Sequence, residues 1–129
     1  MLTRLMPEHL IKEFDRIGRQ ENSRDPVIVA KFFCPSSSAA WYATEFDPDT
    51  ENFFGYVKGI GGKDEWGMFS LNDLSQIRIP VEIVFYDKVT KKTSHAKSYA
   101  RIERDIHFTP RRLSEALPEY FGGASPDKQ

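Results

Sequence analysis

The sequence has little cysteine, little excess charge of either sign and no long apolar run. One cysteine, Cys34, among 129 residues excludes an internal disulfide framework and a zinc site built from cysteines, and it fits a reducing compartment. Lysine and arginine number 18 against 19 aspartate and glutamate residues, which excludes a uniformly basic nucleic-acid coat. No apolar segment has the length of a membrane span, and the first residues lack the apolar stretch of a signal peptide. We therefore expect a cytoplasmic protein without membrane contact.

The residues that are present make up a single domain. Hydrophobic residues form 40% of the chain and charged residues 29%, a balance typical of folded proteins. A chain of this length buries about two-thirds of its unfolded surface, so it folds without a metal or cofactor, and we expect no cofactor. Glycine, serine and proline in residues 122–129 predict a flexible tail, which leaves residues 1–121 as the domain.

Apolar periodicity predicts a helix near each end of the chain and a short helix between them. The first helix covers residues 7–19, ends at Gly18, and should pack its apolar stripe on a sheet. That stripe consists of Leu10, Ile11, Phe14 and Ile17. Ser70 is the predicted cap of the short internal helix, and Thr109 and Pro110 are expected to open the last one.

Six segments rich in β-branched and aromatic residues separate these helices. They are residues 27–33, 40–46, 52–60, 66–70, 81–87 and 94–108. Their connections are too short for the crossovers that parallel strands need. The sequence therefore predicts an α+β domain: a mainly antiparallel sheet of about five or six strands, with helices on one face.

Aromatic residues crowd into one part of the chain. They are Trp41, Tyr42, Phe53, Phe54, Tyr56, Trp66 and Phe69. This density is typical either of the core of a small sheet domain or of a patch that binds a partner. Trp41 and Tyr42 point to opposite faces of their strand, so we expect them to differ in burial.

Charge is separated along the chain although the total is near zero. Residues 88–112 contain eight lysines and arginines against two acids, whereas residues 44–75 contain seven acids against two lysines. The candidate binding residues of the basic stretch are Lys91, Lys92, His95, Lys97, Tyr99 and Arg101. Cations interleaved with an aromatic ring suit a nucleic acid, and they also suit an acidic protein surface. The alternative is a solvated hairpin whose lysines discourage edge-to-edge pairing.

Residues 103–107 form a second candidate site. Alternate residues of a strand share a face, so Glu103, Asp105 and His107 would line up if this segment were a strand. Two carboxylates and an imidazole suit a divalent metal ion that activates water for hydrolysis. Alternatively, the carboxylates pair with neighbouring arginines and His107 is structural. The sequence leaves both interpretations open.

Four motifs occur in order along the chain. They are Thr-Glu-Phe-Asp-Pro at 44–48, Phe-Gly-Tyr-Val at 54–57, Glu-Trp-Gly-Met-Phe-Ser-Leu at 65–71, and Ile-Glu-Arg-Asp-Ile-His-Phe at 102–108, followed by Pro110. As a set they resemble a bacterial family of unknown function that is commonly encoded on plasmids and other mobile elements. The sequence departs from the family's compact pattern between Pro80 and Arg101, where an extra strand pair precedes the last motif. The resemblance implies a bacterial mobile-element setting and transfers no activity or catalytic residue.

The sequence thus predicts a small binding or accessory protein of a bacterial mobile element. It would act without catalysis, through contacts of the basic hairpin with a protein or a nucleic acid. The alternative is a metal-dependent hydrolase that uses Glu103, Asp105 and His107. The sequence identifies no particular partner, and it is compatible with a monomer or a homodimer.

Overall fold

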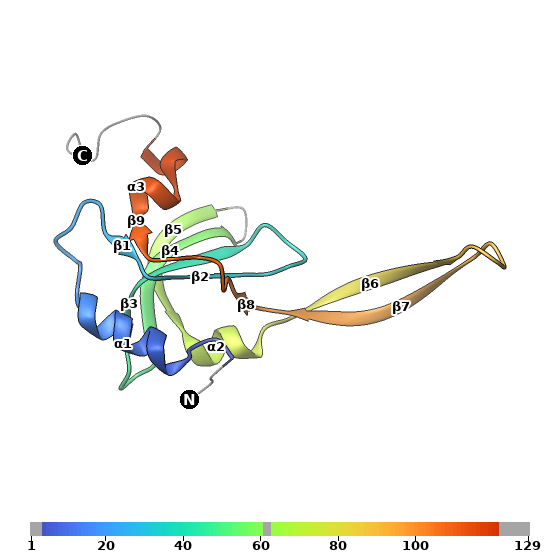
Figure 1. Ribbon diagram of the computed structural model, residues 1–129, viewed down its shortest axis with the longest axis horizontal. Helices are drawn as coiled ribbons and strands as arrows, with labels where there is room; N and C mark the ends of the chain where they lie inside the picture. Colours follow the sequence, from blue (N-terminus) through green and yellow to red (C-terminus); the bar gives the residue numbers. More distant parts are fainter. Residues whose placement is uncertain (1–3, 61–62, 122–129) are drawn as a thin grey trace.

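Five antiparallel strands form the central sheet, in the order β5-β4-β3-β2-β8 (Figure 1). The strands are β2 (Ala30–Phe33), β3 (Ala40–Asp47), β4 (Asn52–Ile60), β5 (Lys63–Ser70) and β8 (Glu103–Arg104). This computed structural model describes residues 4–60 and 63–121, and the tail predicted at 122–129 lies outside the described residues. The predicted antiparallel sheet is confirmed.

Four other strands form two further pairs. In the first pair, β1 (Val27–Ile28) lies beside β9 (Arg111–Arg112). In the second, β6 (Arg78–Asp87) lies beside β7 (Lys92–Arg101) and forms a sheet separate from the central one. The extra strand pair expected between Pro80 and Arg101 is therefore present, but it does not extend the main sheet.

Helices lie at both ends of the described chain and between β5 and β6. They are α1 (Glu8–Ile17), α2 (Leu71–Gln76), α3 (Leu113–Ala116) and the 3-10 helix η1 (Pro118–Phe121). The α+β class is confirmed. Within the described ranges, no helix has the length and apolar character to cross a bilayer.

The first helix follows its sequence signals closely. It starts after Pro7 and ends at Gly18, whose φ of 74° is favourable only for glycine and whose N–H donates to the Phe14 carbonyl. Leu10 and Phe14 are buried in the main core, and Ile11 and Ile17 of the same stripe pack against it. The predicted packing of α1 on the sheet is confirmed.

The internal helix is capped as expected. The Ser70 hydroxyl accepts a hydrogen bond of 2.9 Å from the Asp73 N–H, which satisfies one of the free donors of the first turn. Leu71 and Leu74 then point into the core. The cap and the two buried leucines hold α2 in place, and so they fix the position at which the chain enters β6.

The expectation that helices cover one face of the sheet is wrong, because the protein has a core on each face. Trp41 lies in the larger core with α1 and α2, whereas Tyr42 lies in a smaller core with Leu113 and Leu117. Both side chains are therefore buried, with exposed fractions of 6% and 7%, and the expected difference in burial is also wrong. The short C-terminal elements provide the second cover.

Two predicted strands are interrupted. Segment 27–33 divides at Val29, whose N–H donates to the Ala43 carbonyl at 2.8 Å and joins β1 and β2 to β3. Segment 94–108 divides at Ile102, which is fully buried, and only a two-residue strand follows it. The last helix begins at Leu113, and not after Thr109 and Pro110, because β9 occupies the residues in between.

The middle of the sheet contains a very close backbone approach. Strands β3 and β4 change register between Ala43 and Glu45, and at this irregularity Gly55 lies against Tyr42. A Cβ atom built on Gly55 would lie 2.0 Å from the Tyr42 carbonyl oxygen, so no larger residue fits. Gly67, which pairs with Gly55 from β5, has nothing within 4 Å of its Cβ position.

These two glycines provide a matched test of the sheet. Gly55→Ala should lower the free energy of unfolding by about 1–3 kcal/mol or more, because the backbone of β3 must move. Gly67→Ala should change it by less than about 1 kcal/mol, since the methyl group meets open space. Urea denaturation of both variants measures the difference, and equal effects would contradict the close approach.

Candidate functional site

The most distinctive feature of the molecule is a β-hairpin that leaves the body. Figure 1 shows β6 and β7 side by side, extending away from the other elements. Each strand has 10 residues, and within the described chain they pair only with each other. At a rise of about 3.4 Å per residue, the hairpin is about 30 Å long. We call residues 78–101 the arm.

The register of the arm separates its side chains into two unlike faces. Directly paired residues such as Glu82 and Lys97 lie on the same face, and successive residues alternate. The polar face contains Arg78, Pro80, Glu82, Val84, Tyr86, Thr93, His95, Lys97, Tyr99 and Arg101. Four of the predicted binding residues on β7 therefore share one face, and all four are exposed.

The arm is basic as a whole. It contains six lysines and arginines against two acids, Glu82 and Asp87. Glu82 forms an ion pair with His95 when the imidazole is protonated, and both side chains are 58% exposed. Lys91 and Lys92, the other two predicted binding residues, lie at the tip, where they are exposed. Most of the positive charge of the arm is thus available to a partner.

The second acid holds the turn at the tip. The Asp87 carboxylate accepts hydrogen bonds from the N–H groups of Val89 (2.8 Å) and Thr90 (3.2 Å), which lower the pKa of Asp87. The Lys91 N–H donates to the Asp87 carbonyl and closes the turn. Lys91 adopts the left-handed backbone conformation, with a φ of 58°. Because the ionised carboxylate is the form that accepts these bonds, the turn loosens as the pH falls through the lowered pKa.

The opposite face of the arm is apolar and uncovered along most of its length. Large residues of β6 form a ridge, and small residues of β7 form a strip beside it. The ridge is Ile79, Val81, Ile83 and Phe85, and the strip is Ser94, Ala96, Ser98 and Ala100. Ile79 and Ala100 pack against the main core, whereas Phe85 is 53% exposed. A two-stranded ribbon with one exposed apolar face is marginally stable by itself.

The second predicted site is not assembled as a strand face. Glu103 lies on β8, Asp105 follows it, and His107 lies in a turn. The Asp105 carboxylate accepts the His107 N–H at 3.0 Å, and the Asp105 N–H donates to the Lys31 carbonyl. Among the described residues, no group of three or more histidine, cysteine, aspartate or glutamate side chains is arranged to hold a metal ion. The expected alignment of Glu103, Asp105 and His107 is therefore wrong, because the strand ends before Asp105.

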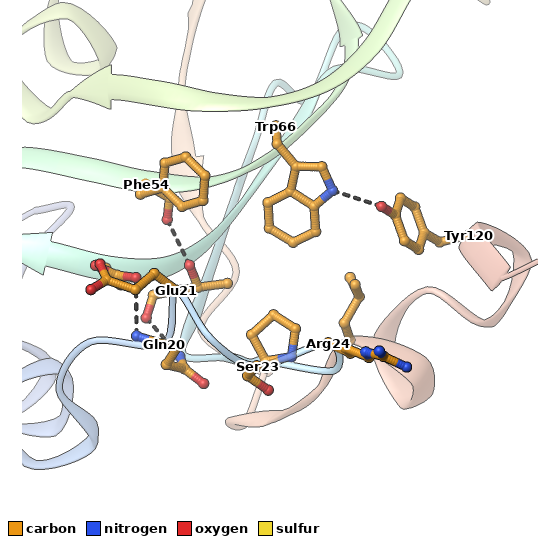
Figure 2. Close-up of a pocket in the computed structure, with 11 residues that line it drawn as sticks. Gln20, Glu21, Ser23, Arg24, Phe54, Trp66 and Tyr120 are labelled. Atoms are coloured by element: carbon orange, nitrogen blue, oxygen red, sulfur yellow. Dashed lines mark hydrogen bonds between the residues drawn. The ribbon is translucent and has the colours of Figure 1, made fainter. Parts of the chain in front are cut away.

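The aromatic residues divide between the core and a small pocket. Phe53 is buried, whereas Phe54 and Trp66 line a pocket of about 260 Å³ on the face of the sheet that carries the smaller core (Figure 2). The two rings stack with centroids 5.9 Å apart, and the Trp66 indole N–H donates to the Tyr120 hydroxyl at 2.8 Å. Sequence reasoning missed this pocket because Tyr120 is distant in the chain.

The polar groups around this pocket hold the neighbouring loop in place. The Gln20 side chain bonds the backbones of Val27 and Thr44, and its backbone N–H donates to Glu45. The Glu21 carboxylate is paired with Arg19 at 2.7 Å. These groups are engaged within the protein, so the arm is the stronger candidate for a binding site.

The fold and the arm define a class: a small α+β protein with a five-stranded antiparallel sheet and a projecting basic β-hairpin. The chain belongs to the family described as "Protein of unknown function (DUF2958)", whose sequence profile matches residues 1–124. The expectation that the chain belongs to a family of unknown function is confirmed. No curated protein and no solved structure matches the chain.

The uncovered arm should open independently of the body. Backbone amides of residues 82–97 should exchange with deuterium at least about a hundredfold faster than those of β3 and β4, because local opening of the arm exposes no buried core. Native-state hydrogen exchange measures this ratio. Equal protection in the arm and the sheet would show that the arm unfolds only together with the body.

Proposed function

We propose that the protein binds single-stranded nucleic acid through the polar face and the tip of the arm. The observation that carries the proposal is the segregation of charge on a free ribbon. Lys97, His95 and Arg101 lie along one face, and Lys91 and Lys92 add two exposed cations at the tip, where Lys92 pairs with Asp87. A row of cations of this kind can follow a phosphate backbone and release its counterions.

Aromatic rings on the same face supply contacts for bases. Tyr86 and Tyr99 are 60% and 65% exposed, although tyrosine rings normally gain free energy when they are buried. Both side chains are thus largely accessible on the face that carries the cations. This combination of a basic track and exposed rings is typical of sequence-tolerant binding to single strands.

The salt dependence of binding tests this proposal. Each phosphate contact on a single strand contributes about −0.7 to the slope of log affinity against log salt. Lys91→Ala combined with Lys92→Ala should flatten the slope by about one to one and a half units, whatever the base sequence. Tyr99→Ala should lower the affinity by about 1–3 kcal/mol per stacked base and leave the slope unchanged. Fluorescence anisotropy between about 50 and 200 mM salt measures both quantities.

A charge-matched control separates the arm from general electrostatics. Lys12→Ala combined with Arg16→Ala removes two exposed cations of α1 and should leave the slope unchanged. Undetectable binding to every oligonucleotide at the lower salt concentration would contradict the proposal. Tighter binding to a duplex would instead favour the arm as a ribbon in the major groove.

The apolar face supports a second candidate function, contact with another protein. A second copy of the chain offers a matching surface, because the ridge on β6 runs beside a strip of small residues on β7. In such a dimer the two arms point in the same direction, their apolar faces meet, and the two-fold axis runs along the arms. The ridge of each arm then lies on the strip of the other. A homodimer of this kind leaves both polar faces outward.

The oligomeric state tests the second candidate. The protein should form a dimer whose fraction rises with concentration, and Phe85→Ser should shift it towards monomer without changing the salt slope for nucleic acid. Val89→Ser is the control, because Val89 is 91% exposed at the tip and lies outside the ridge. Sedimentation equilibrium measures the state, and a monomer at every concentration would contradict this candidate.

The setting of the protein forms the last part of the proposal. The resemblance of the four motifs to a family of mobile elements supports a bacterial origin and a mobile genetic element, and the single cysteine supports the cytoplasm. Sequence-independent binding to single-stranded DNA suits an accessory protein of a mobile element whose DNA is transferred between cells. The hydrolase alternative has no supporting observation among the described residues, because Glu103, Asp105 and His107 do not form a group that could hold a metal ion there.

A further inference from the structure

Four arginines from distant parts of the chain meet where the arm joins the body. Arg78 and Arg101 are the first and last residues of the arm, and they pair directly across its two strands. Arg104 follows on β8, and Arg4 comes from the N-terminal segment, where its side chain donates to the Ile102 carbonyl. We call Arg4, Arg78, Arg101 and Arg104 the root cluster.

The positive charge of the root cluster is not balanced within the described chain. None of the four guanidinium groups lies within 4.0 Å of a carboxylate there. Burial lowers the pKa of Arg4, and the charges of Arg101 and Arg78 lower it further, while Glu103 acts in the opposite direction. Like charges directly opposite each other in a ladder are destabilising, so the Arg78–Arg101 pair costs free energy unless an anion joins it.

A cavity lies between three of these arginines, while the Arg78 guanidinium donates to the Ser75 and Ile77 carbonyls. It has a volume of about 550 Å³, and Arg4, Arg101 and Arg104 line it together with Tyr99 and Glu103. The Nε atom of Arg104 is buried and has no hydrogen-bond partner in the part of the chain that the structure describes. A buried donor without a partner is unfavourable, and because this atom has almost no accessible surface, an anion in the cavity would reach it only after the Arg104 side chain turned towards it.

We propose that the root cluster is a phosphate-binding site that holds a phosphodiester of the strand lying along the arm. The inference rests on the proposed function and adds to it a fixed anchor point. One guanidinium group can donate two parallel hydrogen bonds to the oxygens of one phosphate, and these bonds are more directional than those of a lysine ammonium group. Tyr99 borders the same cavity, so the base next to the anchored phosphate lies within reach of its ring.

Glu103 is the basis of a gain-of-function test. Among the described residues it is the one carboxylate that lines the cavity, and it opposes the binding of an anion there. Glu103→Gln should therefore raise the affinity for a single-stranded oligonucleotide, by about threefold or more, at low salt. A rise in affinity cannot result from misfolding.

Two arginine variants complete the test. Arg101→Gln should lower the affinity about tenfold or more, because hydrogen bonds to a charged group are lost. Arg104→Lys should also weaken binding while the salt slope stays unchanged, because the charge remains and the paired hydrogen bonds are lost. The control Arg19→Gln removes one exposed arginine outside the cluster and should have less than a twofold effect. Thermal melts confirm that each variant is folded.

The outcomes separate this inference from the proposed function. If the Lys91 and Lys92 variants change the salt slope while Glu103→Gln and Arg101→Gln leave the affinity unchanged, the root cluster is not an anchor and the inference is overturned. If no oligonucleotide binds, the proposed function fails, and phosphorus NMR of inorganic phosphate then decides the site. If the protein broadens the phosphate signal and Arg101→Gln abolishes this broadening, the root cluster is a site for free phosphate. If the protein does not broaden the signal, the root cluster does not bind phosphate and the inference is overturned.

Discussion

The Phe53 side chain lies at the centre of the contacts that hold the body together. Its ring is fully buried and contacts the rings of four other phenylalanines, with centroid distances between 4.7 and 5.9 Å. These partners are Phe14, Phe32, Phe46 and Phe69, which come from α1, β2, β3 and β5. One side chain thus joins the first helix to four strands of the sheet. The rigid body formed in this way supports a hairpin that has no core of its own.

The arm differs from the body in that it has no buried core of its own among the described residues. It has hydrogen bonds between its two strands, but the part of the chain that the structure describes supplies neither a third strand nor a covering layer for most of its length, so the exposed side chains of its faces contribute little to its stability. Side chains in such a position are available for contacts outside the chain. The polar face joins the root cluster at Arg78 and Arg101, so the cations of this face and those of the body meet at the base of the arm. The aromatic pocket around Trp66, by contrast, uses its polar neighbours to fix a loop.

Local signals in the sequence predicted the elements better than their assembly. Helical spacing identified the α1 stripe, the serine cap identified the start of α2, and strand alternation placed Lys97, Tyr99 and Arg101 on one face. The sequence could not show that this strand pair leaves the sheet, because the alternation of Val81, Ile83 and Phe85 is also typical of a strand with one buried face. The root cluster was hidden for a different reason: Arg4 meets the end of the arm across 98 residues of chain, and only the tertiary fold brings them together.

The central claim is that the polar face of the arm, anchored at the root cluster, is the binding surface. The most direct measurement is a titration of the isotope-labelled protein with a single-stranded oligonucleotide, followed by NMR. Shifts concentrated on alternate residues from Lys97 to Arg101 and on Arg104, with α1 and β5 unchanged, are the predicted result. Shifts centred on Trp66 and Tyr120 instead, with the arm unchanged, would contradict the account.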